Sequence, residues 1–188
     1  LDTELPAVEA RRLARHRHVA EEVEDEPADA VPLGRREVEP ELATAWEPDA
    51  DLKAWEITLR EGVKFHNGRD MTADDVISSF AFHQAKTSFA RQIVKVEKLG
   101  AHKVRMHLEK SNSEFPYILG EYQLMIMPKA PMDTIGLSGI GTGPYRFVRW
   151  AKDEEIVLEA FDQHWRGAPK IKTVVFRPIP DDAVRVAA

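Results

Sequence analysis

The stretch from residue 55 to residue 82 places the tightest constraint on how this chain folds. Residues 55–60 alternate apolar with polar side chains, which is the period of a strand with one buried face. Asn67-Gly68 then predicts a tight turn, because both residue types tolerate a positive φ. The stretch therefore predicts a strand that runs into a turn.

A capped helix is expected directly after this turn. Thr72 is a suitable N-cap, and Asp75 stands three residues later, where its carboxylate can reach back to the start of the helix. The apolar residues that follow recur at helical spacing and form one stripe. They are Ala73, Val76, Ile77, Phe80 and Ala81. We expect the rest of the chain to pack around this strand, turn and helix.

Short elements are expected on both sides of this unit. Residues 39–47 predict a strand beside 55–60, with 48–51 as the turn and Trp46 and Trp55 as core anchors. Residues 93–98 and 103–108 predict a hairpin, because apolar and charged residues alternate in both. The other expected elements are a helix over 8–23, an irregular loop over 24–37, a helix over 114–119, a strand over 123–127, a helix over 129–135, strands over 146–150, 155–160 and 171–179, and a helix that starts at 180. Together they predict a mixed α/β fold.

Composition excludes several classes of function. The chain has 188 residues with a net charge of −6, which argues against a nucleic-acid binder. It contains no cysteine, so disulfides, thiolate metal sites and cysteine nucleophiles are excluded. No apolar run approaches the roughly 20 residues of a membrane-spanning helix. The first residues lack a signal-peptide pattern, so we expect an exported form to have had its signal cleaved or left out.

The sequence offers weak support for catalysis or a metal site. The serine, phosphate-loop and dinucleotide motifs are absent, and Asp74-Asp75 suit a helix N-terminus, where the dipole favours acids. There are seven histidines, but neither His16 with His18 nor His102 with His107 is spaced to share one face. We therefore expect no enzyme, no cofactor and no metal. A metal-dependent enzyme built on the histidines remains the weakest alternative.

Three motifs, in order, resemble one family. The first is Leu-Arg-Glu-Gly-Val-Lys-Phe-His-Asn-Gly at 59–68, followed by Thr-Ala-Asp-Asp-Val at 72–76; the second is Gly-Thr-Gly-Pro-Tyr at 141–145; the third is 161–170. Their residues and spacing resemble the signature of the extracellular solute-binding proteins of family 5. That family includes dipeptide-, oligopeptide- and nickel-binding components of ABC importers. The resemblance covers 40–188. The chain departs from the family in Asn67, where aspartate is usual, and in 24–37.

The resemblance implies a fold, an activity and a location. The fold is a periplasmic-binding-protein lobe of the second type with a small α+β subdomain attached. Residues 1–50 would begin lobe I, 51–140 would form the subdomain, and 141–188 would return to lobe I before lobe II. The implied activity is capture of a peptide-like solute, without catalysis, at the periplasmic or extracellular face of the cytoplasmic membrane. The implied partners are the solute and an ABC permease.

The glycine-rich loop over 136–143 has two interpretations. It is either a flexible connection before a strand or a backbone-rich wall of the cleft between lobes, where exposed amides meet a ligand. On the second interpretation the ligand-binding residues are Gly141, Thr142, Gly143 and Tyr145. Tyr145 is also a candidate core residue. The rival function is a truncated lobe that acts as an interaction module or a homodimer through an exposed apolar face, with no solute.

Overall fold

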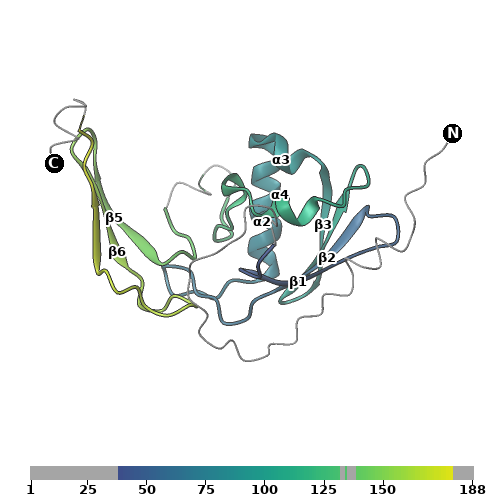
Figure 1. Cartoon of the computed structure of the whole chain (residues 1–188), viewed down its shortest axis with the longest axis horizontal. Coiled ribbons are helices and arrows are strands. Elements are labelled where there is room, and N and C mark those ends of the chain that lie inside the picture. The colour runs from purple at the N-terminus through teal and green to yellow at the C-terminus, as the bar shows by residue number, and fades with distance from the viewer. Residues whose placement is uncertain (1–37, 132–133, 135–138, 180–188) are drawn as a thin grey trace, which may run out of the picture.

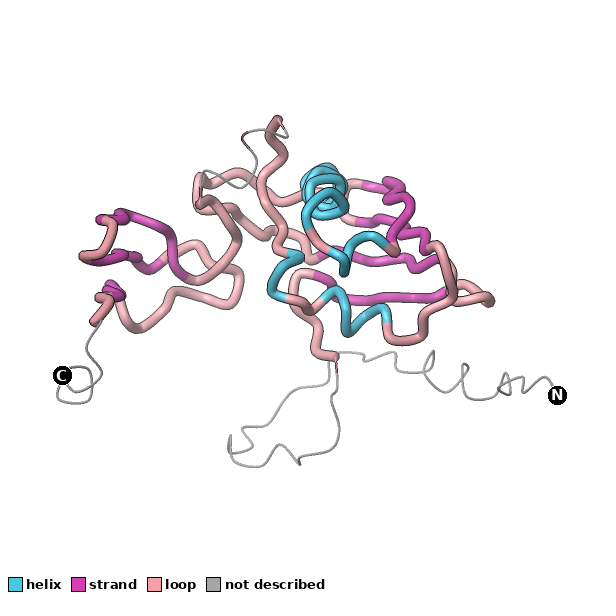
Figure 2. Tube along the Cα trace, turned by 90° about the horizontal axis from the view of Figure 1, so that it is seen from above, coloured by secondary structure: helices cyan, strands magenta, loops and turns pink. Residues whose placement is uncertain are grey.

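The computed structural model describes residues 38–131, 134 and 139–179, and every structural statement below concerns these residues. Their elements form two antiparallel sheets and confirm the predicted mixed α/β class (Figures 1 and 2). In chain order they are β1 (Ala43–Pro48), β2 (Ala54–Leu59), α2 (Ala73–Lys86), α3 (Ser88–Arg91), β3 (Ile93–Gly100), β4 (Lys103–Leu108), α4 (Phe115–Leu119), the 3₁₀ helix η1 (Tyr122–Leu124), β5 (Tyr145–Ala151), β6 (Glu155–Ala160) and β7 (Thr173–Phe176). The helix expected over 8–23, the loop over 24–37 and the helix from 180 lie outside the described residues.

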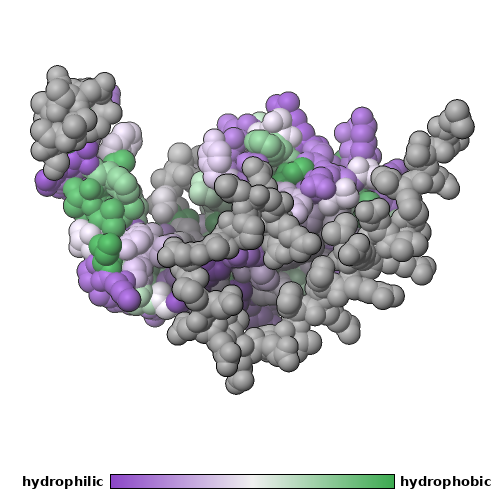
Figure 3. All heavy atoms as spheres, viewed as in Figure 1, coloured by the Kyte–Doolittle hydropathy of each residue, from purple (hydrophilic) through white to green (hydrophobic). Residues whose placement is uncertain are grey.

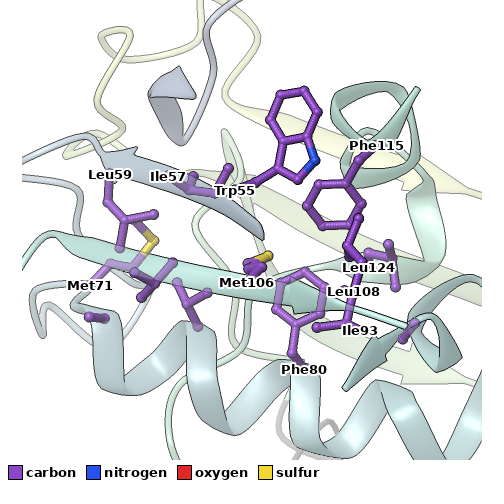
Figure 4. Packing of buried hydrophobic residues seen from close by; sticks show 14 of the residues in the cluster. Trp55, Ile57, Leu59, Met71, Phe80, Ile93, Met106, Leu108, Phe115 and Leu124 are labelled. Atoms are coloured by element: carbon purple, nitrogen blue, oxygen red, sulfur yellow. The ribbon is translucent and has the colours of Figure 1, made fainter. Parts of the chain in front are cut away.

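The first sheet has the strand order β1-β2-β4-β3, and its inner face carries the core. Along β2 the side chains alternate as expected, so that Trp55, Ile57 and Leu59 are buried. They pack against the apolar stripe of α2, including Val76 and Phe80 (Figure 4). Burial of each such large apolar side chain stabilises the fold by about 1.5–3 kcal/mol. Because β1 pairs with β2, strands of this one sheet lie on both sides of the boundary expected at residue 50.

The predicted β3–β4 hairpin is present, with one irregularity in its edge strand. Ile93 pairs with Leu108, but the register shifts before Lys95, so β3 carries a bulge at this point. Ile93 therefore points into the core, and Val94 is 59% exposed. The alternation in the sequence had predicted one solvent-exposed face and one buried face along the whole strand.

The turn after β2 is a three-residue loop made of His66, Asn67 and Gly68. The N–H of Phe65 donates to the Arg69 carbonyl at 2.8 Å, and the N–H of Gly68 donates back to the Phe65 carbonyl at 2.8 Å. Only Gly68 of the expected pair has a positive φ, at 83°. A hairpin loop of three residues that closes on a left-handed glycine is a common type. The turn is thus confirmed, and its positive φ is at Gly68 alone of the two residues.

The expected helix cap is present and is buried. Asp75 accepts a hydrogen bond from the backbone N–H of Thr72 at 2.9 Å, which closes the first turn of α2. The same carboxylate pairs with Arg69 at 2.5 Å and accepts the backbone N–H of Lys129 at 2.8 Å. Burial alone would raise the pKa of the Asp75 carboxyl, but these hydrogen bonds together hold its pKa below the ordinary value.

The strand expected over 123–127 is absent. Residues 122–124 form η1 instead, and 125–131 have no regular secondary structure. The helix expected over 129–135 is not formed at 129–131, and most of its remainder lies outside the described residues. Leu124 and Met127 are nevertheless buried.

Side chains of α2 form the hydrogen bonds to the backbone of 125–129 that a neighbouring strand would form in a sheet. Asp75 binds Lys129 N–H, Ser79 binds both the N–H and the carbonyl of Met127 at 2.8 and 3.2 Å, and His83 Nε2 donates to the Met125 carbonyl at 2.8 Å. Asp75, Ser79 and His83, here called the polar stripe, are four residues apart along the helix, a rise of about 6.0 Å per step. Two residues of extended chain span about 6.6 Å. The two spacings match, so alternate backbone groups of the extended segment meet successive turns of the helix.

The second sheet has the strand order β5-β6-β7. Its side chains are more exposed than those of β2 and β4 in the first sheet. Its expected strands are present, although β7 is shorter than the predicted 171–179. Figure 3 shows apolar residues gathered over β5 and β6. The exposed large apolar residues of this region are Phe147, Val148, Trp150, Ile156, Ile171, Val175 and Phe176.

Replacement of Asp75 tests the cap and its pH dependence. We expect Asp75→Asn to lower the unfolding free energy by about 2–4 kcal/mol near neutral pH, because buried backbone donors lose a charged acceptor. Because the pKa of Asp75 is lower in the folded chain, its stabilisation is full above the unfolded value of about 3.9 and is lost as the pH falls through the folded value. The difference between wild type and variant should therefore narrow below about pH 4.

Urea unfolding of both proteins between pH 7 and pH 3 measures this difference. Asp74→Asn is the matched control, since Asp74 is the neighbouring acid but is half-buried and pairs with Lys98 at 2.8 Å. Equal losses for the two variants, or a difference that stays constant down to the lowest pH, would contradict the assigned role of Asp75.

The polar stripe makes a second prediction. Ser79→Ala leaves the buried backbone N–H of Met127 without its acceptor, so we expect a loss of about 1–3 kcal/mol in unfolding free energy. Ser78→Ala changes the adjacent, more exposed serine and should alter stability by less than about 0.5 kcal/mol. Chemical denaturation distinguishes the two, and a Ser79→Ala protein as stable as Ser78→Ala would show that the segment is held by other contacts.

Candidate functional site

Two contacts join the first sheet to the start of the second, and the first is centred on His66. The backbone N–H of His66 donates to the Gly141 carbonyl at 2.9 Å. The Gly141 N–H donates in return to His66 Nδ1 at 3.2 Å, and His66 Nε2 lies 3.0 Å from the Gly143 carbonyl. A carbonyl only accepts and a backbone N–H only donates, so Nε2 carries the proton and Nδ1 carries none. The arrangement therefore requires the neutral imidazole.

The His66 ring also contacts Phe161, the residue that directly follows β6. Its edge meets the ring of Phe161 with 5.2 Å between centroids at 76°. Phe161 is buried and donates its backbone N–H to the Pro144 carbonyl at 2.9 Å. One residue further along each strand, Tyr145 pairs with Ala160 where β5 and β6 meet. His66 thus contacts the segment before β5 and the residue after β6.

The second contact is centred on Trp165, in the turn region after β6. The guanidinium carbons of Arg60 and Arg166 lie 4.5 and 4.7 Å from the centre of the Trp165 ring system. Glu41 binds both cations, through its carbonyl to Arg60 at 2.9 Å and through its carboxylate to Arg166 at 2.7 Å. Trp165 also packs against the core of the first sheet. Cation–π contacts of this kind contribute about 0.5–1 kcal/mol each at exposed sites.

A small open pocket of about 160 Å³ lies beside the His66 contact. It is lined by His66, Asn67, Gly139, Ile140, Arg146 and Phe147. Arg146 supplies the positive charge of this lining, and it is paired with Glu159 at 2.5 Å. Since one water occupies about 30 Å³ of liquid, the pocket can hold a few waters or one small group, not a whole peptide.

The predicted ligand-binding residues lie at this junction but not in the pocket lining. Gly141 and Gly143 are bonded to His66, Thr142 is half-buried between them, and Tyr145 is half-buried at the first position of β5. Of the two interpretations, a flexible connection and a cleft wall, the geometry at 139–143 shows a loop fixed by defined hydrogen bonds. Its contact with a ligand remains a prediction.

Sequence reasoning missed the pairing of two motifs that it had already found. His66 belongs to the first motif and Gly141 and Gly143 to the second, but no pattern in the chain indicated that the two bind each other. Arg146 and Phe147 were assigned only to a strand. A signal was available in part, because a histidine beside an exposed turn and a glycine-rich segment are a natural donor and acceptor set.

The other histidines of the described residues do not form a metal site. Within 38–131, 134 and 139–179 no group of three or more potential metal ligands is placed together. His107 binds Glu97 at 3.2 Å on the outer face of the first sheet. His16 and His18 lie outside the described residues. None of the described helices is long and apolar enough to cross a bilayer.

Known proteins resemble this chain both in sequence and in structure. The model of a family described as "Bacterial extracellular solute-binding proteins, family 5 Middle" matches residues 37–188. A dipeptide-binding protein of Escherichia coli (strain K12) is 31% identical over 187 residues, which cover 82% of this chain and 35% of the relative. Residues 37–188 include all three motifs and the junction that they build.

Solved structures agree with the sequence relatives. The oligopeptide-binding protein AppA from Bacillus subtilis, in complex with a nonapeptide, matches with a TM-score of 0.70 at 28% identity, over 78% of this chain and 32% of that chain. NikZ from Campylobacter jejuni, in complex with Ni(L-His), matches with a TM-score of 0.70 at 27% identity, over 79% of this chain and 32% of that chain.

The predicted fold and the resemblance are therefore confirmed over the matched residues. The two sheets reproduce part of a periplasmic binding protein, and the chain spans about a third of the length of the relatives that it matches. This chain belongs to the bacterial extracellular solute-binding proteins of family 5.

Proposed function

We propose that the chain serves in the solute-binding component of an ABC importer, where it helps to capture a peptide-like solute and pass it to a membrane permease. The observation that carries this proposal is the junction at His66, where the family motifs at 59–68, 141–145 and 161–170 meet in space. Motifs separated by about a hundred residues serve one structural purpose there, as expected for a part of the binding-protein fold. No catalytic step is needed for this activity.

Peptide is the solute class that the comparisons support best. Relatives carry the names dipeptide-binding protein, oligopeptide-binding protein and di/tripeptide-binding protein. Others are named for heme or glutathione, and one solved relative holds Ni(L-His). Because the relatives' names span several solutes, the class for this chain is our proposal and the specific solute is left to experiment.

The proposed solute contacts are Gly141, Thr142, Gly143 and Tyr145. Two properties support them. The loop is fixed by His66, so its backbone is already ordered before a ligand arrives, which reduces the entropy that binding must overcome. The loop also lies where two sheets join, and binding sites favour such interfaces.

The family resemblance also suggests how the chain divides into domains and where the protein is located in the cell. From the resemblance we propose that residues 51–140 make up the small α+β subdomain, that 1–50 belong to the N-terminal part of lobe I, and that 141–188 return to lobe I. The location is the outer side of the cytoplasmic membrane, because the family is extracellular. Both assignments come from the resemblance rather than from a contact in the structure.

A second function is favoured by one observation, the exposed apolar side chains of the second sheet. Trp150 is 65% exposed, and Ile156 and Phe176 pair beside it across the three strands. Such a face suits a second copy of the chain, as in a dimer without solute. The experiment below separates this alternative from solute binding.

Native mass spectrometry and calorimetry test the proposal. We expect the monomer to gain the mass of one peptide when mixed with a set of di- to pentapeptides, and titration to give a saturable one-to-one isotherm. Thr142→Val and Tyr145→Phe each remove one hydroxyl, so each should weaken binding by about fivefold, the effect of one lost hydrogen bond. Thr173→Val is the control, since Thr173 is exposed on β7, and it should bind as wild type does.

The other outcomes have definite meanings. A chain that binds a nickel–histidine mixture but no peptide would contradict the peptide class. A ligand-free dimer would favour the second function. A monomer that binds neither probe would contradict a working solute site within these residues.

A further inference from the structure

We propose that His66 is a positioning residue that holds the Gly141 amide of the loop 139–143 only in its neutral form, so that this bond is lost and the loop is loosened when His66 is protonated. Its importance for solute capture rests on the proposed function. The contact itself rests on geometry alone, because three hydrogen bonds join one residue of the first sheet's turn to two glycines of the loop.

The two ring nitrogens of His66 have opposite roles in this contact. Nε2 must donate, because the carbonyl oxygen of Gly143 can only accept. Nδ1 must accept, because the backbone N–H of Gly141 can only donate. A second proton on the ring would convert Nδ1 into a donor that faces another donor. Protonation therefore removes one hydrogen bond and sets two N–H groups against each other.

The loop is also anchored by Ile140, which packs against the core of the first sheet, while the two glycines are bonded to His66. Addition of a Cβ atom at Gly141 would meet only the His66 ring within 4 Å, at 3.9 Å from Cε1, and a Cβ at Gly143 would meet nothing. His66 is therefore the side chain on which the backbone of the two glycines rests. Its own position is fixed by the hairpin loop that closes at Gly68 and by the edge contact with Phe161.

The charged groups on the elements around His66 are paired with groups of opposite charge. On the loop side, Arg146 lines the same pocket and is matched by Glu159. On the turn, Lys64 is paired with Asp70 and Arg69 with Asp75. Beside Phe161, Asp162 is paired with Lys172. Each of these acids already has a cation, so none is placed to receive protonated His66 in exchange for the lost bond.

The consequence is a joint between the two sheets that responds to pH. Histidine is the side chain whose charge change ordinarily falls between about pH 5 and pH 8, and the joint is tested over this range. While His66 is neutral the loop is fixed and Tyr145 is held at the start of β5. When His66 is protonated the loop loses its bond at the Gly141 amide, and we expect weaker solute binding with unchanged folding of the first sheet.

Amide hydrogen exchange followed by NMR tests this inference on the whole chain without a ligand. The protection factor of the Gly141 amide should fall by about tenfold between pH 7.5 and pH 5.5, the effect of losing one hydrogen bond of ordinary strength. Protection factors are compared, so that the intrinsic pH dependence of exchange cancels. Core amides such as that of Met106 should keep their protection at both values.

Two conservative variants separate the two ring nitrogens. In His66→Asn the side-chain oxygen is two bonds from Cβ, as Nδ1 is, so the Gly141 amide should stay protected at both pH values. In His66→Gln the nitrogen is three bonds from Cβ, as Nε2 is, so the bond to Gly143 is kept and Gly141 should be poorly protected at both. His107→Gln is the matched control, because it alters a histidine on the outer face of the sheet. It should retain the wild-type pH response.

The ring nitrogens of wild-type His66 provide a measurement that does not depend on any variant. At pH 7.5 the ¹⁵N spectrum should show a neutral ring with its proton on Nε2. A proton on Nδ1, or a Gly141 protection factor that does not change with pH, would overturn the inference. Failure of peptide binding with this pH response intact would count against the proposed function and leave the joint in place.

Discussion

The buried carboxylate of Asp75 is the constraint on which most of this structure depends. It closes the first turn of α2 through Thr72, pairs with Arg69 from the preceding turn, and accepts the backbone N–H of Lys129 from a segment that follows 54 residues later. A buried charge is costly unless its acceptor sites are used, and here the turn, the helix N-cap and the extended segment each supply a donor. The same group therefore fixes the unit predicted from residues 55–82 and the path of the chain beyond it.

Further contacts of the same kind lie along α2, and the segment that they hold leads to the joint between the sheets. The polar stripe holds 125–129 against the helix, and that segment leads toward the loop that His66 binds. His66 stands in the hairpin loop immediately before the helix, so both ends of the connection start from the same short stretch of sequence. This explains in physical terms why motifs far apart in the chain belong to one family signature: each supplies one side of a contact that the others need.

Local patterns predicted most of the fold because they depend on neighbours in sequence. The alternation at 55–60, the cap at Thr72 and Asp75 and the hairpin at 93–108 are all present. The strand expected over 123–127 is absent, because its backbone partners are helix side chains and no local pattern encodes them. The bond between His66 and Gly141 was missed for the same reason. The motifs were visible, but their contact is a property of the folded chain.

The central claim is that helix side chains, and not a neighbouring strand, hold the segment at 125–129. The most direct measurement is amide hydrogen exchange at Lys129 and Met127, whose N–H groups donate to Asp75 and Ser79. The account predicts that both amides exchange about as slowly as those in the middle of α2, since they should open only when the helix itself unfolds. Rapid exchange at both amides, at the rate of an exposed loop, would contradict it.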